Sequence, residues 1–275
     1  MALLNRLKFW KRTTPRVAVI RLVGVIGGQT GGLRRGLNFD SVAPLLKKAF
    51  NVSRIRAVVL VINSPGGSPV QSQLIAARIR QLSKEKDVPV LSFCEDVAAS
   101  GGYWLAAAAD EIYASEASVI GSIGVISAGF GFPELLEKIG VERRVYTSGK
   151  SKSMLDPFRP EKPEDVEYLK SLQNDIHQQF IDYVRTRRGT RLSEDEAELF
   201  SGRFWTGRHA LKLGLIDNTG LLHDVLETRF GKEVEQVAIS QKRSFLPFGG
   251  GMAESLMDHF LARLEARGLW QRFGL

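Results

Sequence analysis

A serine followed by two glycines is the feature of this sequence best suited to chemistry. Ser100, Gly101 and Gly102 lie between a predicted buried strand at residues 88–93 and an alanine-rich helix predicted over residues 103–109. At such a turn, backbone N–H groups and the positive end of the helix converge. The turn suits a nucleophilic hydroxyl whose substrate develops negative charge, and a plain helix cap is the structural alternative.

A second glycine-bearing turn follows a neighbouring predicted strand. That strand is the continuously apolar run at residues 57–62, which ends in Asn63-Ser64-Pro65-Gly66-Gly67. A glycine lets a backbone N–H approach a substrate carbonyl without a clash from Cβ. The N–H groups of Gly67 and Gly101 are therefore candidates for an oxyanion hole, with an ordinary strand-to-helix turn as the alternative.

No histidine stands out as the base that would activate Ser100. The histidines all lie far downstream: His177, His209, His223 and His259. His177 and His209 fall in predicted helices, and neither has an acidic partner in a recognisable motif. Asp96 lies close to the nucleophile turn, where a carboxylate is more often a structural hydrogen-bonding group.

Lysine is the remaining option for a general base. Lys150 and Lys152 lie in a polar loop at residues 146–153, after a predicted strand at residues 141–146. A lysine acts as a base only when neutral, so the pKa of such a lysine must fall from about 10.4 towards 7 or 8. Burial away from carboxylates favours that fall, whereas most lysines of a basic protein are solvated surface groups.

The composition is that of an ordinary globular protein, with 44% hydrophobic and 25% charged residues among 275. The net charge is +8, but the basic residues are spread along the chain without a nucleic-acid-binding motif. No nucleic-acid partner is therefore predicted, and an anionic membrane surface is at least as good a partner. The single cysteine, Cys94, excludes an internal disulfide and fits a reducing compartment.

Residues 1–12 interleave leucines and a tryptophan with basic side chains, a pattern typical of an interfacial helix or, equally, of a frayed basic tail. No apolar run approaches the roughly 18 residues that span a bilayer. We therefore expect no signal peptide or transmembrane helix, and a location in the cytoplasm or peripherally on the inner membrane.

Strands and helices that alternate along the chain predict an α/β architecture. The predicted strands are residues 16–26, 57–62, 88–93 and 111–114, and the predicted helices include one from Asp40 or Ser41 to residue 50 and one that begins at Ser68 and Pro69. A long helix from Pro163 to Gly189 has an apolar stripe that is expected to face inward: Val166, Leu169, Leu172, Ile176, Phe180 and Val184.

Four ordered motifs carry a resemblance to a known family. NSPGG, AASGGYW, GSIGV and SGKSK, within residues 16–237, resemble the signal peptide peptidase A (protease IV) family of serine peptidases. The resemblance implies a Clp-protease/crotonase-like α/β fold of repeated strand–helix units with a helical C-terminal part. No cofactor or metal is expected.

The resemblance also implies a Ser/Lys dyad in place of a Ser-His-Asp triad. Ser100 matches the nucleophile, and Lys152, the second lysine of its loop, matches the base. Ser122, in GSIGV, matches a serine that orients the lysine amine. Gly67 and Gly101 match the oxyanion donors.

The expected function is a serine endopeptidase that cleaves short unfolded or apolar peptides such as signal-peptide remnants. The alternatives are a crotonase-like acyl-CoA enzyme and a non-catalytic membrane-associated scaffold. We expect a basic tail at residues 1–15, one peptidase domain at residues 16–240, and a linker with an amphipathic helix at residues 241–275. Because the loop of Lys152 has no apolar anchor, a homo-oligomeric ring, an octamer by resemblance, is expected to desolvate it.

Overall fold

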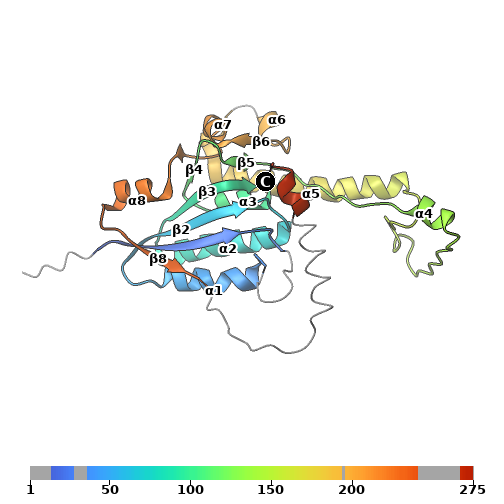
Figure 1. The fold of residues 1–275 in the computed structure, drawn as a ribbon, viewed down its shortest axis with the longest axis horizontal. Coiled ribbons are helices and arrows are strands. Elements are labelled where there is room, and N and C mark those ends of the chain that lie inside the picture. The colour runs from blue at the N-terminus through green and yellow to red at the C-terminus, as the bar shows by residue number, and fades with distance from the viewer. Residues whose placement is uncertain (1–13, 28–35, 194–195, 241–266, 275) are drawn as a thin grey trace, which may run out of the picture.

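The computed structural model describes residues 14–27, 36–193, 196–240 and 267–274 (Figure 1). The predictions for the basic tail and for the linker therefore fall almost entirely outside the described residues. In the ranges that the structure describes, every helix is too short or too polar to cross a bilayer.

A single eight-stranded sheet forms the centre of the described structure. Its strands are β1 (Arg16–Val23), β2 (Ile55–Ser64), β3 (Val90–Ala99), β4 (Glu111–Ala114), β5 (Val119–Gly121), β6 (Phe204–Thr206), β7 (Asn218–Thr219) and β8 (Glu235–Ile239). The main order is β6-β5-β3-β2-β1-β8, and only β5 and β6 pair antiparallel. The first half of β3 pairs with β4 and its last three residues pair with β5. Because β1, β2, β3 and β5 are parallel, their carboxyl ends meet at one edge.

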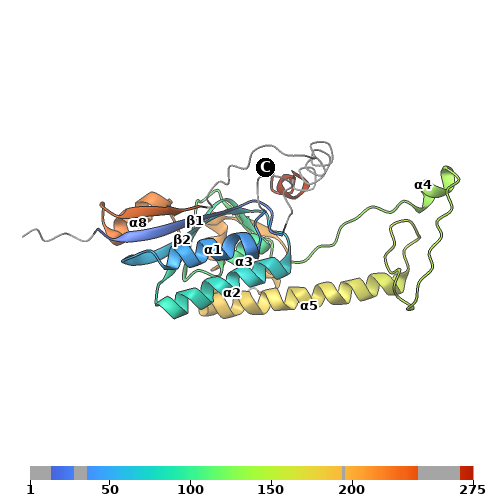
Figure 2. The ribbon, with the colours of Figure 1, turned by 90° about the horizontal axis from the view of Figure 1, so that it is seen from below.

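Helices cover both faces of this sheet (Figures 1 and 2). The labelled helices are α1 (Phe39–Phe50), α2 (Pro69–Lys86), α3 (Gly101–Ala106), α4 (Pro133–Lys138), α5 (Pro163–Arg188), α6 (Glu196–Leu199), α7 (Gly207–Lys212) and α8 (Leu222–Phe230), with a 3₁₀ turn at Gly189–Arg191. Leu60 of β2 points into a core shared with α1, α2 and α3, whereas Val59 points into a second core with Leu226 of α8. Burial on both faces explains why β2 is apolar at consecutive positions.

Several predicted boundaries differ from the observed ones. Helix α1 is capped by the side chain of Asn38, which accepts the N–H of Ser41, and not by Asp40 or Ser41. Strand β3 continues six residues beyond the predicted end at Phe93. The predicted strand at residues 141–146 is wrong, because that segment lies along a projecting part of the chain with no strand beside it.

The long helix α5 has the predicted ends, with Pro163 in its first turn and Gly189 after its last residue. Its apolar stripe is buried only in the second half, where Phe180 stacks on Trp104 of α3 with ring centroids 4.5 Å apart. Leu172, in the first half, is exposed because α5 runs past the end of the sheet (Figure 2). The expectation that the whole stripe faces inward is therefore wrong for the first half.

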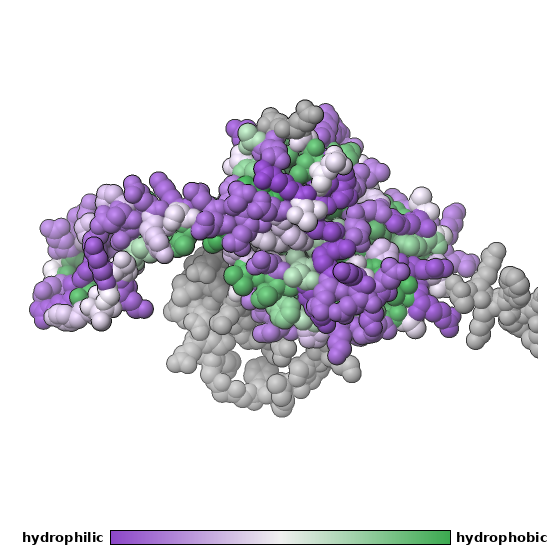
Figure 3. Space-filling model, turned by 180° about the vertical axis from the view of Figure 1, so that it is seen from behind, coloured by the Kyte–Doolittle hydropathy of each residue, from purple (hydrophilic) through white to green (hydrophobic). Residues whose placement is uncertain are grey.

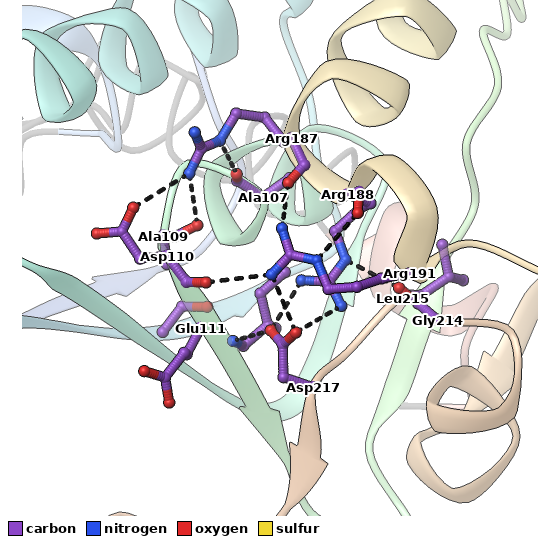
Figure 4. A network of polar contacts seen from close by, with 12 residues as sticks. Ala107, Ala109, Asp110, Glu111, Arg187, Arg188, Arg191, Gly214, Leu215 and Asp217 are labelled. Carbon is purple, nitrogen blue, oxygen red and sulfur yellow. Dashed lines mark hydrogen bonds and ion pairs between the residues drawn. The ribbon is translucent and has the colours of Figure 1, made fainter.

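A buried arginine ties the end of α5 to the sheet (Figure 4). The Arg188 side chain is 1% exposed, and its two terminal nitrogens donate to the Asp217 carboxylate at 2.8 and 3.0 Å. Asp217 also accepts the N–H of Ile112 on β4 at 2.7 Å, and Arg191 pairs with it at 3.1 Å. The network joins three segments that are far apart in sequence, so it fixes where α5 leaves the sheet.

We expect Asp217→Asn to lower the free energy of unfolding by about 3 kcal/mol, because Arg188 would remain buried without its charged partner. Urea unfolding of the full chain measures this change. Glu116→Gln is the control, since it removes an exposed pair with Arg208 and should change stability by less than about 1 kcal/mol. Equal midpoints for Asp217→Asn and the control would contradict the prediction.

The Asp217 carboxylate makes the stability of the protein depend on pH. Burial alone would raise the pKa of Asp217, but the hydrogen bonds and charge of Arg188 hold that pKa below its usual value. The contribution of Asp217 is therefore present above about pH 4 and lost as the pH falls through the folded-state pKa. The stability difference between wild type and Asp217→Asn should be largest near neutral pH and should shrink below about pH 4.

Candidate active site

Ser100 occupies a strained turn between β3 and α3. Its backbone has φ 52° and ψ −122°, a conformation that residues other than glycine rarely adopt. Its N–H donates to the carbonyl of Gly121 at 2.8 Å, and its own carbonyl accepts the N–H of Trp104 at 3.0 Å. Its hydroxyl makes no helix-capping bond within the described chain, so the alternative of a plain helix cap is not supported. The turn holds a half-buried hydroxyl at the carboxyl edge of the sheet.

The loop after β2 packs directly on this serine. A Cβ on Gly66 would lie 2.7 Å from Cβ of Ser100 and 2.9 Å from the nitrogen of Gly101, and Gly66 has φ 105°. Only glycine allows this approach. Gly67 of this loop was predicted to have a role and Gly66 was not, although the doubled glycine after the strand is a signal of close approach. The two glycine turns are therefore brought together, as predicted.

Two backbone N–H groups near Ser100 have no carbonyl partner in the described chain. The N–H of Gly101 lies in the first turn of α3, where no helical carbonyl precedes it. Gly67 bridges to Ile26 through its neighbours, since Ser68 donates to Ile26 and Ile26 donates to Gly66, both at 2.8 Å. Gly67 itself donates to no described backbone carbonyl. An oxyanion donor must likewise have no backbone carbonyl partner of its own.

Ser122 lies close to Ser100 because β5 pairs with the end of β3. Ala99 is the register partner of Gly121, the residue that also accepts the N–H of Ser100. Ser122 follows with φ 53° and is 6% exposed, and its N–H donates to the carbonyl of Arg203 at 2.6 Å. The structure therefore brings Ser122 to the nucleophile turn.

Lys152 lies elsewhere, on a segment that we call the arm, residues 124–162. In both ribbon views the arm, with α4, projects beyond the sheet beside the first half of α5 (Figures 1 and 2). Lys152 is exposed, and its N–H donates to Gly149 at 3.2 Å in a tight turn. Within one chain the structure does not bring Lys152 to Ser100.

The arm is locally ordered by its own contacts. Arg143 donates to the well-covered carboxylate of Asp156 at 2.9 Å, and this hydrogen bond holds the pKa of Asp156 below its usual value. The rings of Phe132 and Phe158 lie 5.8 Å apart, and the N–H of Phe132 donates to the carbonyl of Pro157 at 2.6 Å. The arm therefore has a defined local fold without packing on the sheet.

Two further titratable side chains lie near the turn in the part of the chain that the structure describes. Nε2 of His177 lies 3.0 Å from the carbonyl oxygen of Ile123, a contact that requires this nitrogen to donate. Burial raises the pKa of Cys94 to about 12, so its thiol is not a reactive thiolate. Among the described residues no group of three or more histidine, cysteine or acidic side chains is arranged to hold a metal ion.

Comparison with known proteins assigns the family. The sequence pattern of Peptidase family S49 matches residues 82–235, more than half of the chain. This chain belongs to peptidase family S49. A putative signal peptide peptidase SppA of Enterococcus faecium is 33% identical, and the match covers 71% of this chain and 56% of that protein. The resemblance predicted from the four motifs is confirmed, and the family is one of peptidases.

A longer relative and a solved structure complete the comparison. A protein of Brucella abortus (strain 2308) named Na(+)/H(+) antiporter NhaA is 49% identical over 96% of this chain, which spans only 39% of that protein. That name belongs to the longer protein, and its activity is not assigned to this chain. A mutant of the 1510-N membrane-bound stomatin-specific protease matches with a TM-score of 0.50 at 16% identity, covering 83% of this chain and 98% of that one. This likeness confirms the predicted Clp-protease-like α/β fold.

Gly66→Ala should slow the reaction of Ser100 with a fluorophosphonate by about 100-fold, because the added methyl displaces the serine on which Gly66 packs. Labelling rates of the purified chain measure this. Gly268→Ala is the control, since a Cβ there would meet nothing within 4 Å. Labelling of Gly66→Ala at the wild-type rate would refute the assigned contact.

Proposed function

We propose that this chain is a serine endopeptidase in which Ser100 is the nucleophile and Lys152 of a neighbouring copy is the general base. The observation that carries the proposal is the strained Ser100 turn packed against Gly66, with the N–H groups of Gly67 and Gly101 left without described carbonyl partners. A positive φ at a serine between a strand and a helix is how nucleophile turns present a hydroxyl to substrate.

The proposed reaction uses the neutral amine of Lys152 to take the proton from Oγ of Ser100. Oγ then attacks the scissile carbonyl, and the negative charge that forms on its oxygen is stabilised by the N–H groups of Gly67 and Gly101. Collapse of the intermediate breaks the C–N bond, and the lysine returns the proton to the leaving amine. Water then hydrolyses the acyl-serine by the same steps, and Ser122 orients the lysine amine.

The substrates proposed are short unfolded or apolar peptides such as signal-peptide remnants. Support comes from apolar side chains exposed around the oxyanion loop. Val23 ends β1 opposite Asn63, and Val70 and Leu74 lie on the first turns of α2, just after the loop. Exposed apolar side chains beside a reactive centre favour apolar peptide side chains.

A homo-oligomeric ring, an octamer by resemblance, is proposed to complete the dyad. The arm exposes many apolar side chains, and Figure 3 shows apolar residues along it. Phe130 is 82% exposed and Tyr146 is 91% exposed. A projecting segment with this much exposed apolar surface is typical of an interface. One peptidase domain at residues 16–240 and a peripheral membrane contact by the N-terminal or the C-terminal amphipathic segment complete the proposal.

Ser100→Ala should abolish both peptide cleavage and fluorophosphonate labelling while leaving the unfolding midpoint unchanged. Lys152→Arg should also abolish cleavage, because a guanidinium does not deprotonate in proteins. Lys150→Ala is the matched control from the same loop and should retain most activity. Peptide-library cleavage read by mass spectrometry measures all three variants. Undiminished cleavage by Ser100→Ala would end the proposal.

A dyad shared between copies has its own test. Inactive Ser100→Ala and inactive Lys152→Ala proteins, mixed under conditions that exchange subunits, should regain part of the wild-type activity. The regain arises because some interfaces then join an intact Ser100 to an intact Lys152. No regain after demonstrated subunit exchange, or a fully active monomer in sedimentation, would exclude the shared dyad.

A further inference from the structure

The ladder between β2 and β3 slips where the two strands approach the active site. Ile62 is the register partner of Cys94, but Ser64 is the partner of Ala98. Asn63 therefore stands opposite three residues of β3, residues 95–97. A slip of this kind interrupts the regular backbone hydrogen bonds and bends the bulged strand. Here it falls between the regular sheet and the Ser100 turn.

The side-chain amide of Asn63 closes this gap. Its Oδ1 accepts the N–H of Val97 at 3.2 Å, and its Nδ2 donates to Oδ2 of Asp96 at 2.6 Å. A backbone N–H can only donate and a carboxylate accepts, so the two partners fix which end of the amide is which. The backbone carbonyl of Asn63 accepts the N–H of Gly24 at 2.9 Å, which ties the same residue to the end of β1.

We call the hydrogen bonds of the Asn63 side chain to Val97 and Asp96 the clamp. Both halves of the proposed site begin immediately beyond it. On β2, Ser64 accepts the N–H of Gly66 on its hydroxyl at 3.2 Å, and the oxyanion loop follows. On β3, Val97 leads through two alanines to Ser100. A change in the offset between the two strands would therefore move Gly66 and Gly67 relative to Ser100.

We propose that Asn63 is a positioning residue of the catalytic site, which fixes the offset between the oxyanion loop and the nucleophile turn by bridging the bulge in β3. Asp96 is its partner: the carboxylate holds the amide and touches no reacting atom. The inference rests on the proposed function and adds to it a residue outside the dyad and the oxyanion donors.

A second tie at the same bulge supplies a matched control. Arg21 of β1 pairs with Glu95 at 2.6 Å, but its side chain is largely exposed. An exposed ion pair contributes little to stability. This pair joins only two side-chain ends, whereas Asn63 also accepts the part-buried backbone N–H of Val97. Arg21→Ala should therefore leave kcat, KM and the unfolding midpoint close to those of wild type.

The test is a charge exchange across the clamp in the full chain. Asn63→Asp sets two carboxylates against each other, so kcat for a peptide substrate should fall by about 100-fold with little change in KM, and labelling of Ser100 should slow in parallel. Asp96→Asn should remain active, because the introduced amide oxygen still accepts from Asn63. The double variant Asn63→Asp, Asp96→Asn reverses donor and acceptor and should recover most of the wild-type kcat.

Recovery in the double variant, at an unfolding midpoint near that of wild type, supports a positioning role. Wild-type kcat in Asn63→Asp would overturn the inference, and so would a double variant that remains slow or fails to fold. Wild-type protein that neither cleaves peptides nor labels would overturn the proposed function and this inference together. Active wild type with an active Asn63→Asp variant would overturn the inference alone.

Discussion

The backbone contact between Gly66 and Ser100 is the constraint on which the candidate site depends. With Cβ positions that would come within 2.7 Å, the loop after β2 can reach the serine only if it carries no side chain at that point. The contact in turn requires the parallel alignment of β2 and β3, the bulge opposite Asn63, and the positive φ of Ser100. The bulge and the positive φ are locally unfavourable, so the surrounding sheet must hold them in place.

That support comes from helix α3 and the polar network beneath it. Arg187 of α5 donates to the carbonyls of Ala107 and Ala109 at 2.9 and 2.8 Å, which satisfies orphan carbonyls at and just after the end of the helix that Ser100 begins (Figure 4). Tyr103 is buried in the middle of α3 and donates to the carbonyl of Leu215 at 2.8 Å. Burial raises the pKa of its phenol, which stays a neutral donor. The nucleophile helix is thus held at its centre and at its end by groups that lie about 80 to 110 residues away in sequence.

The sequence was sufficient for the central strands and for the Ser100 turn, because both depend on local patterns. Continuous apolar runs marked the central strands, Ser68 and Pro69 marked the start of α2, and the doubled glycines marked the two turns. The position of Lys152 relative to Ser100 was not predictable from local patterns. Leu172 lies in an apolar stripe with the period of a buried helix face, yet it is exposed in this chain. Periodicity indicates which face of a helix is apolar, but it does not indicate what packs on that face. The bulge opposite Asn63 left no signal, since strand patterns carry no information on a slip in register.

In the proposed mechanism, the separation of Ser100 from Lys152 on the arm links catalysis to assembly through a simple balance of free energies. A lysine whose pKa falls by three units carries a cost of about 4 kcal/mol for its charged form. Removing apolar surface from water contributes about 25 cal/mol per Å², so burial of about 160 Å² offsets that cost. One aromatic side chain buries about 150–250 Å², and Phe130 and Tyr146 on the arm are both almost fully exposed. In the proposed ring, covering these side chains would offset the cost of a neutral lysine. In the proposed mechanism, a lone chain keeps the Ser100 hydroxyl in place but does not bring Lys152 beside it.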